Sequence, residues 1–172
     1  MGGSGGGSVG GESLMAKYES QIKQLNCPVE NVYAKLSDLN NLAIIKERFN
    51  DPMVQEAMVA SGKVPEDKLG QIKDAVGKLE FTRDTMSGEF AMVGKVGVEI
   101  INREENKCIK FASAQSPVKF NLWIQVLPTS TYTSKMRLTI DADIPFILKS
   151  MIGNKLENGI DKFADMLAMI PY

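Results

Sequence analysis

The residue types that most often carry out chemistry in proteins are scarce in this chain. It contains no histidine, which excludes Ser-His-Asp and Cys-His triads and His-ligated metal sites. General acid–base chemistry would depend on Asp, Glu, Lys or Tyr side chains with shifted pKa values. Cys27 and Cys108 are too few and too far apart for a disulfide framework or a zinc site, so we expect buried or edge thiols. We predict no catalytic residue, no metal site and no cofactor.

Two carboxylates are spaced as an acid–base pair would be. Asp141 and Asp143 share one face of a predicted strand, an arrangement that supports such chemistry in other sites. Because Ile140 and Ala142 alternate with them, we expect both carboxylates to face solvent on the outer side of the sheet. By a similar alternation Trp123 falls on the polar face of its own strand, where it would pack beneath a neighbouring segment or lie at an interface.

Alternation of apolar and polar residues predicts most of the elements that would position a site. It indicates a first strand at 17–25 and a run of about six strands from residue 78 onward. Short polar turns separate the later strands, which favours antiparallel pairing, because parallel strands need long crossovers. Pro28 and the apolar spacing after it predict helices over 28–49. The looser segment 51–77 predicts short helices that either pack on the domain or form a mobile lid over a cavity mouth.

The last segment, 145–170, predicts one long amphipathic helix. Its apolar residues recur every three or four positions and form one stripe: Leu148, Ile152, Leu156, Ile160, Phe163, Leu167 and Ile170. At about 1.5 Å per residue this helix would be about 39 Å long, enough to cross a small sheet. The fold class is therefore α+β, with helices packed on one face of an antiparallel sheet. Such a sheet commonly leaves an apolar space under its helix, which indicates ligand binding.

Composition limits the function classes. The 20 basic and 21 acidic residues nearly cancel, which argues against a nucleic-acid or anionic-membrane surface. Residues 1–14 include a Gly- and Ser-rich run and are predicted to be a flexible expression linker, with Met15 as the natural start and 15–172 as one domain. No stretch approaches the about 18 apolar residues that span a bilayer. With no signal peptide evident, we expect a cytoplasmic protein without integral membrane association.

Several short motifs are distributed over nearly all of residues 16–172. They are Tyr18-Glu19-Ser20, Pro28-Val29-Glu30-Asn31-Val32-Tyr33, Leu36-Ser37-Asp38-Leu39, Phe120-Asn121-Leu122-Trp123-Ile124-Gln125 and Gly159-Ile160-Asp161-Lys162-Phe163-Ala164. With these motifs the chain resembles the START-like, or SRPBCC, superfamily, which includes polyketide cyclase/dehydratase-like proteins. It looks most similar to small uncharacterised members of the Bacteroidetes type. The resemblance implies a helix-grip fold, in which a curved sheet of about six or seven strands wraps around a long C-terminal helix, with short helices after the first strand.

The resemblance also implies a kind of function. Members of this superfamily typically hold apolar molecules between the sheet and the helix, and a minority perform cyclisation or dehydration there. We therefore expect a carrier or sensor of a hydrophobic small molecule such as a lipid, a polyketide-like or an aromatic compound. A cyclase- or dehydratase-type enzyme and a protein-interaction module are the alternatives, and a homodimer is left open. The missing histidine favours a binding protein over an enzyme.

The expected ligand contacts are apolar side chains on the inner face of the strands and on the last helix. They are Phe81, Phe90, Met92, Val98, Phe111, Phe120, Leu122, Met136, Leu138, Ile152, Leu156, Ile160 and Phe163. Tyr33 belongs with them, because it lies within an apolar helix face and could direct its hydroxyl into a cavity or bond it to the backbone. Eight methionines remain besides Met1 and Met15, and flexible thioethers suit pockets that accept varied ligands.

Overall fold

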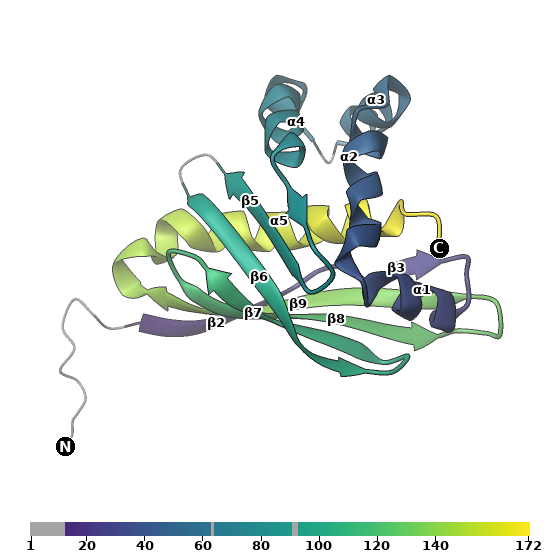
Figure 1. The fold of residues 1–172 in the computed structure, drawn as a ribbon. Coiled ribbons are helices and arrows are strands. Elements are labelled where there is room, and N and C mark those ends of the chain that lie inside the picture. The colour runs from purple at the N-terminus through teal and green to yellow at the C-terminus, as the bar shows by residue number, and fades with distance from the viewer. Residues whose placement is uncertain (1–12, 63, 91–92) are drawn as a thin grey trace, which may run out of the picture.

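The computed structural model describes residues 13–62, 64–90 and 93–172. Its strands form one antiparallel sheet in the order β2-β9-β8-β7-β6-β5-β4, and β3 also pairs with β9. The strands are β2 (Ser13–Glu19), β3 (Lys23–Leu25), β4 (Glu80–Phe81), β5 (Thr85–Phe90), β6 (Gly94–Glu104), β7 (Cys108–Gln115), β8 (Lys119–Pro128) and β9 (Ser134–Pro145). The sheet curves around the long helix α5 (Lys149–Ala168), which confirms the predicted helix-grip fold (Figure 1).

The predicted first strand, 17–25, is in fact two strands, β2 and β3, separated by residues 20–22. The Ser20 backbone N–H donates to Leu138 O at 2.9 Å, whereas the Leu138 N–H donates to the Ser20 hydroxyl at 3.0 Å. The hydroxyl thus takes the place of a strand carbonyl, and regular pairing stops. The next backbone N–H, of Gln21, donates to Asp161 Oδ1 on α5 at 2.8 Å. The prediction of one continuous strand was wrong because alternation does not reveal this side-chain substitution.

Short helices follow β3, as predicted. They are α1 (Val29–Leu36), η1 (Leu39–Ala43), α2 (Ile44–Phe49), α3 (Pro52–Ala60), η2 (Glu66–Lys68) and α4 (Leu69–Gly77). Two begin at aspartates that cap them: the Asp38 carboxylate accepts from Asn40 N at 3.0 Å, and the Asp51 carboxylate accepts from Met53 N at 2.9 Å. Such caps satisfy backbone donors that a helix start leaves unpaired. Local sequence therefore sets where these helices begin.

The segment 51–77 contains α3, η2 and α4, which stand beside α2 and away from most of the sheet (Figure 1). Met58, Val64 and Val76 are buried and belong to the main core. Both α3 and α4 contact α2, and α4 also contacts β5. The predicted short helices are therefore present and packed, while most of their other side chains are exposed.

Helix α5 follows a short turn, η3 (Phe146–Leu148), and packs mainly on β9, β2 and β3 (Figure 1). Its buried stripe is deepest toward the C-terminal end, where Ile160, Ala164 and Leu167 are 7%, 0% and 0% exposed. The earlier members of the stripe, Ile152 and Leu156, are only half-buried. The predicted spacing of the stripe is confirmed, but its two halves are covered to different extents.

Lys23 of β3 ties the C-terminal half of α5 to the sheet. Its Nζ lies 3.0 Å from Asp161 Oδ1 and 2.9 Å from Asp165 Oδ1, and its side chain is only 10% exposed. Burial alone would lower the pKa of Lys23. Hydrogen bonds to Asp165 and Asp161, together with their charges, outweigh burial and raise this pKa above its usual value of about 10.5. We call Lys23, Asp161 and Asp165 the lysine clamp.

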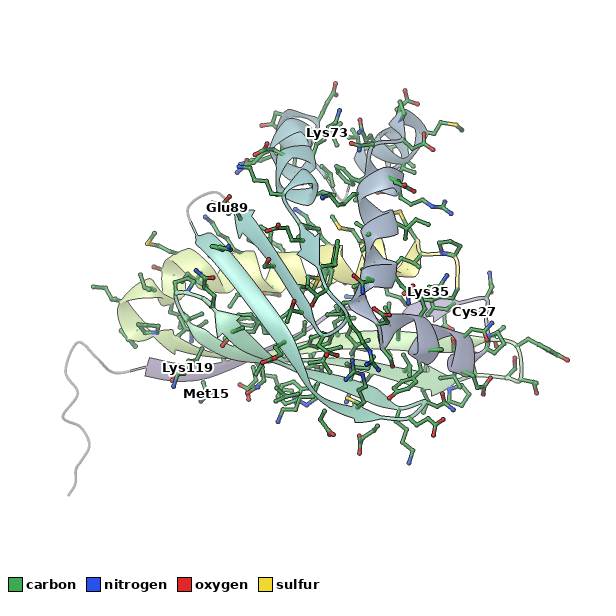
Figure 2. The ribbon with its side chains drawn as sticks, in the orientation of Figure 1. Met15, Cys27, Lys35, Lys73, Glu89 and Lys119 are labelled. Carbon is green, nitrogen blue, oxygen red and sulfur yellow. The ribbon has the colours of Figure 1, made fainter. Side chains whose placement is uncertain are left out.

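The two carboxylates considered as an acid–base pair lie on the outer face of the sheet. Asp141 lies opposite Lys17 of β2, and Asp143 lies between Met15 of β2 and Lys119 of β8. Figure 2 shows Met15 and Lys119 at this same edge of the molecule. Each carboxylate therefore has a lysine directly opposite it on a neighbouring strand, an arrangement in which opposite charges stabilise a sheet.

Trp123 also lies where the alternation places it. It pairs with Lys110 of β7 and Thr139 of β9, and Lys110 Nζ lies 5.3 Å from the centroid of its ring. At this distance the ammonium is attracted to the face of the indole. The ring is half-buried among strand neighbours on the outer face.

Arg103, near the end of β6, contacts the end of α1 and the turn before β5. Its Nη2 donates to Ser37 O at 2.7 Å and pairs with Asp84 Oδ1 at 2.6 Å. The pairing of β6 with β7 shifts register between Ile100 and Asn102, and such an irregularity turns the following side chains to the other face. Arg103 thereby joins the end of α1 to the turn before β5.

Candidate functional site

The candidate site is the apolar interface between the concave face of the sheet and α5, which we call the helix–sheet interface. Six predicted contacts are buried there: Val98, Phe111, Leu122, Met136, Leu138 and Ile160. Six others are half-buried: Tyr33, Phe81, Phe120, Ile152, Leu156 and Phe163. All except Ile152 belong to the core or pack against it. The fold therefore brings most of the predicted residues into one apolar region.

One of the predicted contacts is placed differently. Phe90 ends β5 and is 40% exposed. Two atoms of its ring lie 3.1 and 3.2 Å from the position that a Cβ on Gly88 would occupy, and Leu79 Cδ2 lies 2.9 Å from it. Phe90 and Leu79 therefore fill the place of the missing side chain. Met92 lies outside the described residues.

Met86 is a half-buried residue of this region that the sequence analysis did not include. It pairs with Phe81 on one side and with Val98 on the other. Strand β5 begins at Thr85, and a turn lies just before it. In that turn the Thr85 N–H donates to Thr82 Oγ1 at 3.0 Å, and the Thr82 N–H donates to Thr85 O at 2.9 Å. The alternation of apolar and polar residues continues through Met86, and this pattern could have identified it as an inward-facing residue.

The polar group among the predicted contacts is the hydroxyl of Tyr33. Tyr33 lies on α1, and its ring packs against the core. No hydrogen bond joins its hydroxyl to another residue of the described chain. The Tyr33 hydroxyl is therefore available to donate or accept a hydrogen bond.

The two cysteines and Tyr172 are not among the predicted contacts, and their pKa values are raised. Burial and the charge of Cys27 raise the pKa of Tyr172, whose hydroxyl donates to Leu167 O at 2.8 Å. Burial also raises the pKa values of Cys27 and Cys108, so both thiols stay protonated near neutral pH. The Ser134 hydroxyl donates to Cys27 O at 2.9 Å. Protonated thiols are weak nucleophiles.

The described residues also form two hollows that are open to solvent. One, of about 500 Å³, is lined by Asn50, Gly70, Lys73, Asp74, Gly77 and Lys78. The other, of about 550 Å³, is lined by Tyr18, Phe146, Lys149, Ser150, Gly153, Asn154 and Glu157. We call the second the Tyr18 hollow. Sequence analysis predicted neither hollow, because each one depends on how separate segments of the chain pack against one another.

Within residues 13–62, 64–90 and 93–172, no group of three or more His, Cys, Asp or Glu residues is placed to hold a metal ion. The helices of the same ranges are all too short or too polar to cross a membrane.

No family model and no curated protein matches the sequence. Solved structures match it in fold. Norcoclaurine synthase from Thalictrum flavum, in complex with dopamine and hydroxybenzaldehyde, is 12% identical, with 95% of this chain and 91% of that chain covered at a TM-score of 0.59. A conserved protein from Geobacillus kaustophilus is 15% identical, with 89% and 93% covered at a TM-score of 0.53.

A protein from Thermobifida fusca matches at 11% identity, with 90% of this chain and 91% of that chain covered and a TM-score of 0.54. At these identities the likeness concerns the fold. It confirms the predicted helix-grip fold and gives no support to a Bacteroidetes-type relative.

Proposed function

We propose that this protein binds a hydrophobic small molecule at the helix–sheet interface and acts as its carrier or sensor. The observation that supports this most is a set of apolar side chains left half-buried around a single core. They come from β4, β5, β8 and α5: Phe81, Met86, Phe120, Leu156 and Phe163. Protein interiors are normally close-packed, so large apolar side chains that stay partly uncovered around one core are a surface that an apolar ligand can cover.

The matched structures support the chemical class of the ligand. The norcoclaurine synthase structure holds dopamine and hydroxybenzaldehyde, which are both small aromatic molecules. A similar fold can therefore accommodate aromatic ligands. In this chain Phe81, Phe120 and Phe163 would provide aromatic contacts, and the Tyr33 hydroxyl would provide one hydrogen bond.

An enzyme of the cyclase or dehydratase type is the second candidate, and the likeness to norcoclaurine synthase favours it. Its chemistry would have to use the Tyr33 hydroxyl, because the other predicted contacts are apolar. A lone hydroxyl without a neighbouring base is a weak acid–base catalyst, so binding without turnover is the preferred proposal. Turnover of a bound aromatic aldehyde and amine, abolished by Tyr33→Phe, would instead establish the enzyme.

We further propose that the segment 51–77 acts as a lid over this interface. Three buried side chains hold it, Met58, Val64 and Val76, and most of the rest is exposed. Weakly packed segments open more readily than core elements. Amide hydrogen exchange across 51–77 should slow when an apolar ligand is bound, and unchanged exchange would contradict a lid.

The binding proposal is tested with the neutral fluorescent probe N-phenyl-1-naphthylamine, titrated into the protein. We expect saturable binding that weakens about tenfold in Leu156→Gln, because the variant places a polar group in the apolar contact. Leu127→Gln is the matched control, because Leu127 is 54% exposed on β8. Equal affinity in both variants and the wild type, or no saturable binding, would contradict the proposal.

A further inference from the structure

The Tyr18 hollow lies on a different flank of α5 from the helix–sheet interface. The helical part of its lining is spaced three or four residues apart, on one face: Phe146, Lys149, Ser150, Gly153, Asn154 and Glu157. Its facing wall is Tyr18 of β2. Its volume of about 550 Å³ falls within the range of roughly 300–1,000 Å³ that small-molecule sites occupy.

Tyr18 presents a fixed polar group to this hollow. Its ring packs against the core, and its hydroxyl makes no hydrogen bond to another residue in the described ranges. A Cβ on Gly153 would lie 3.0 Å from the Tyr18 hydroxyl oxygen. The glycine therefore leaves the hydroxyl uncovered, and packing of the ring fixes its direction.

The other polar side chains of the hollow are one cation, one anion and two neutral groups. Lys149 carries a positive charge and has no ion-pair partner among the described residues. Ser150, Asn154 and Tyr18 can each donate a hydrogen bond. Glu157 is the one lining group that only accepts. The Lys149 ammonium can pair with a negatively charged head group, and the three neutral groups can donate hydrogen bonds to it.

Phe146 gives the hollow an apolar wall. It lies on η3, immediately before α5, and is 67% exposed. An exposed aromatic ring beside a polar hollow offers a flat surface on which an aromatic or aliphatic group can stack. The ligand would therefore combine an anionic head with an apolar body.

We propose that the Tyr18 hollow binds small organic carboxylates. The carboxylate accepts hydrogen bonds from Lys149 Nζ and the Tyr18 hydroxyl, and the apolar body of the ligand lies against Phe146. This site is separate from the helix–sheet interface and does not depend on the function proposed for that interface.

The test is a ¹H–¹⁵N NMR titration of the intact protein with three compounds that share one body: 3-phenylpropionate, 3-phenylpropan-1-ol and 3-phenylpropylamine. We expect 3-phenylpropionate to shift the amides of Tyr18 and of residues 149–157 saturably. The alcohol and the amine should bind about tenfold more weakly or not at all, because a charged hydrogen bond is lost. Equal binding of the acid and the alcohol, or shifts confined to other residues, would overturn the proposal.

Three variants complete the test. Tyr18→Phe keeps the ring and should weaken 3-phenylpropionate about fivefold, and Lys149→Gln should weaken it about tenfold. Lys73→Gln is the control, because Lys73 lies on α4 and lines the other hollow (Figure 2). Wild-type affinity in both Tyr18→Phe and Lys149→Gln would overturn the assignment. Binding of N-phenyl-1-naphthylamine should be unchanged by the acid, which separates this site from the helix–sheet interface.

Discussion

The two halves of α5 are held against the sheet in different ways. In the C-terminal half, Ile160, Ala164 and Leu167 are buried, and the lysine clamp closes the flank beside them. In the N-terminal half, Ile152 and Leu156 are half-buried, and the flank of the helix borders the Tyr18 hollow instead of an ion-pair cluster. A surface that binds a ligand must leave apolar and polar groups exposed, and this exposure lowers the stability of the folded protein. The comparison shows that the C-terminal half of the helix is buried more deeply than the N-terminal half. This difference agrees with the proposal that the less buried half contacts a ligand.

The largest expected difference between the halves is in packing. Leu167→Ala should lower the free energy of unfolding by about 3 kcal/mol, because it leaves a cavity in a close-packed core. Ile152→Ala should lower it by about 1 kcal/mol, because a half-buried side chain loses less contact. Guanidinium unfolding of both variants measures this. Equal costs would show that the two halves are packed alike.

The lysine clamp should give the next largest effect. Lys23→Met should lower the free energy of unfolding by about 2 kcal/mol, because it leaves the partly buried Asp161 and Asp165 without their lysine. Lys78→Met is the control: Lys78 Nζ lies 3.2 Å from Asp74 Oδ2, and both side chains are at least half exposed. We expect a change within about 0.5 kcal/mol there. A similar loss in both variants would mean that the clamp does not anchor α5.

The clamp also has a signature in pH. The pKa of Lys23 is raised in the folded state above its usual value of about 10.5. Its stabilisation is therefore complete below pH 10.5 and is lost as the pH rises through the folded-state pKa. The difference in unfolding free energy between wild type and Lys23→Met should shrink in that range. A difference that stays constant from neutral to strongly alkaline pH would contradict the raised pKa.

The smallest expected effects come from two glycines of α5. Nothing lies within 4 Å of a Cβ placed on Gly159, so Gly159→Ala should stabilise the protein by about 1 kcal/mol through helix propensity. A Cβ on Gly153 would lie 3.0 Å from the Tyr18 hydroxyl oxygen. Because of this close contact, the gain in stability from Gly153→Ala should be about 1 kcal/mol smaller than the gain from Gly159→Ala. Thermal unfolding compares the two. Equal stabilisation would show that the Tyr18 hydroxyl moves away freely.

Periodic patterns made the fold largely predictable. Spacing of three and four residues located α5, and alternation located the strands, because a buried face imposes both patterns. The same patterns placed Asp141 and Asp143 on the outer face and most of the predicted contacts in one apolar region. These features depend on many residues at once, so a single irregular residue does not hide them.

Single contacts between distant residues were not predictable. Ser20 ends a strand through a bond to Leu138, and a register shift turns Arg103 toward Ser37. The Tyr18 hollow likewise joins β2 to α5, which no local pattern indicates. Each of these contacts depends on how closely two distant segments approach in space, and no local pattern in the sequence indicates that distance.

The central claim is that an apolar ligand binds at the helix–sheet interface. Methyl NMR of protein labelled at Met and Leu, titrated with N-phenyl-1-naphthylamine, tests it most directly. We predict saturable shifts of the methyl groups of Met86 and Leu156, with Leu127 and Leu167 unchanged. Shifts of Leu127 without Met86 and Leu156, or no saturable shift at all, would contradict the claim.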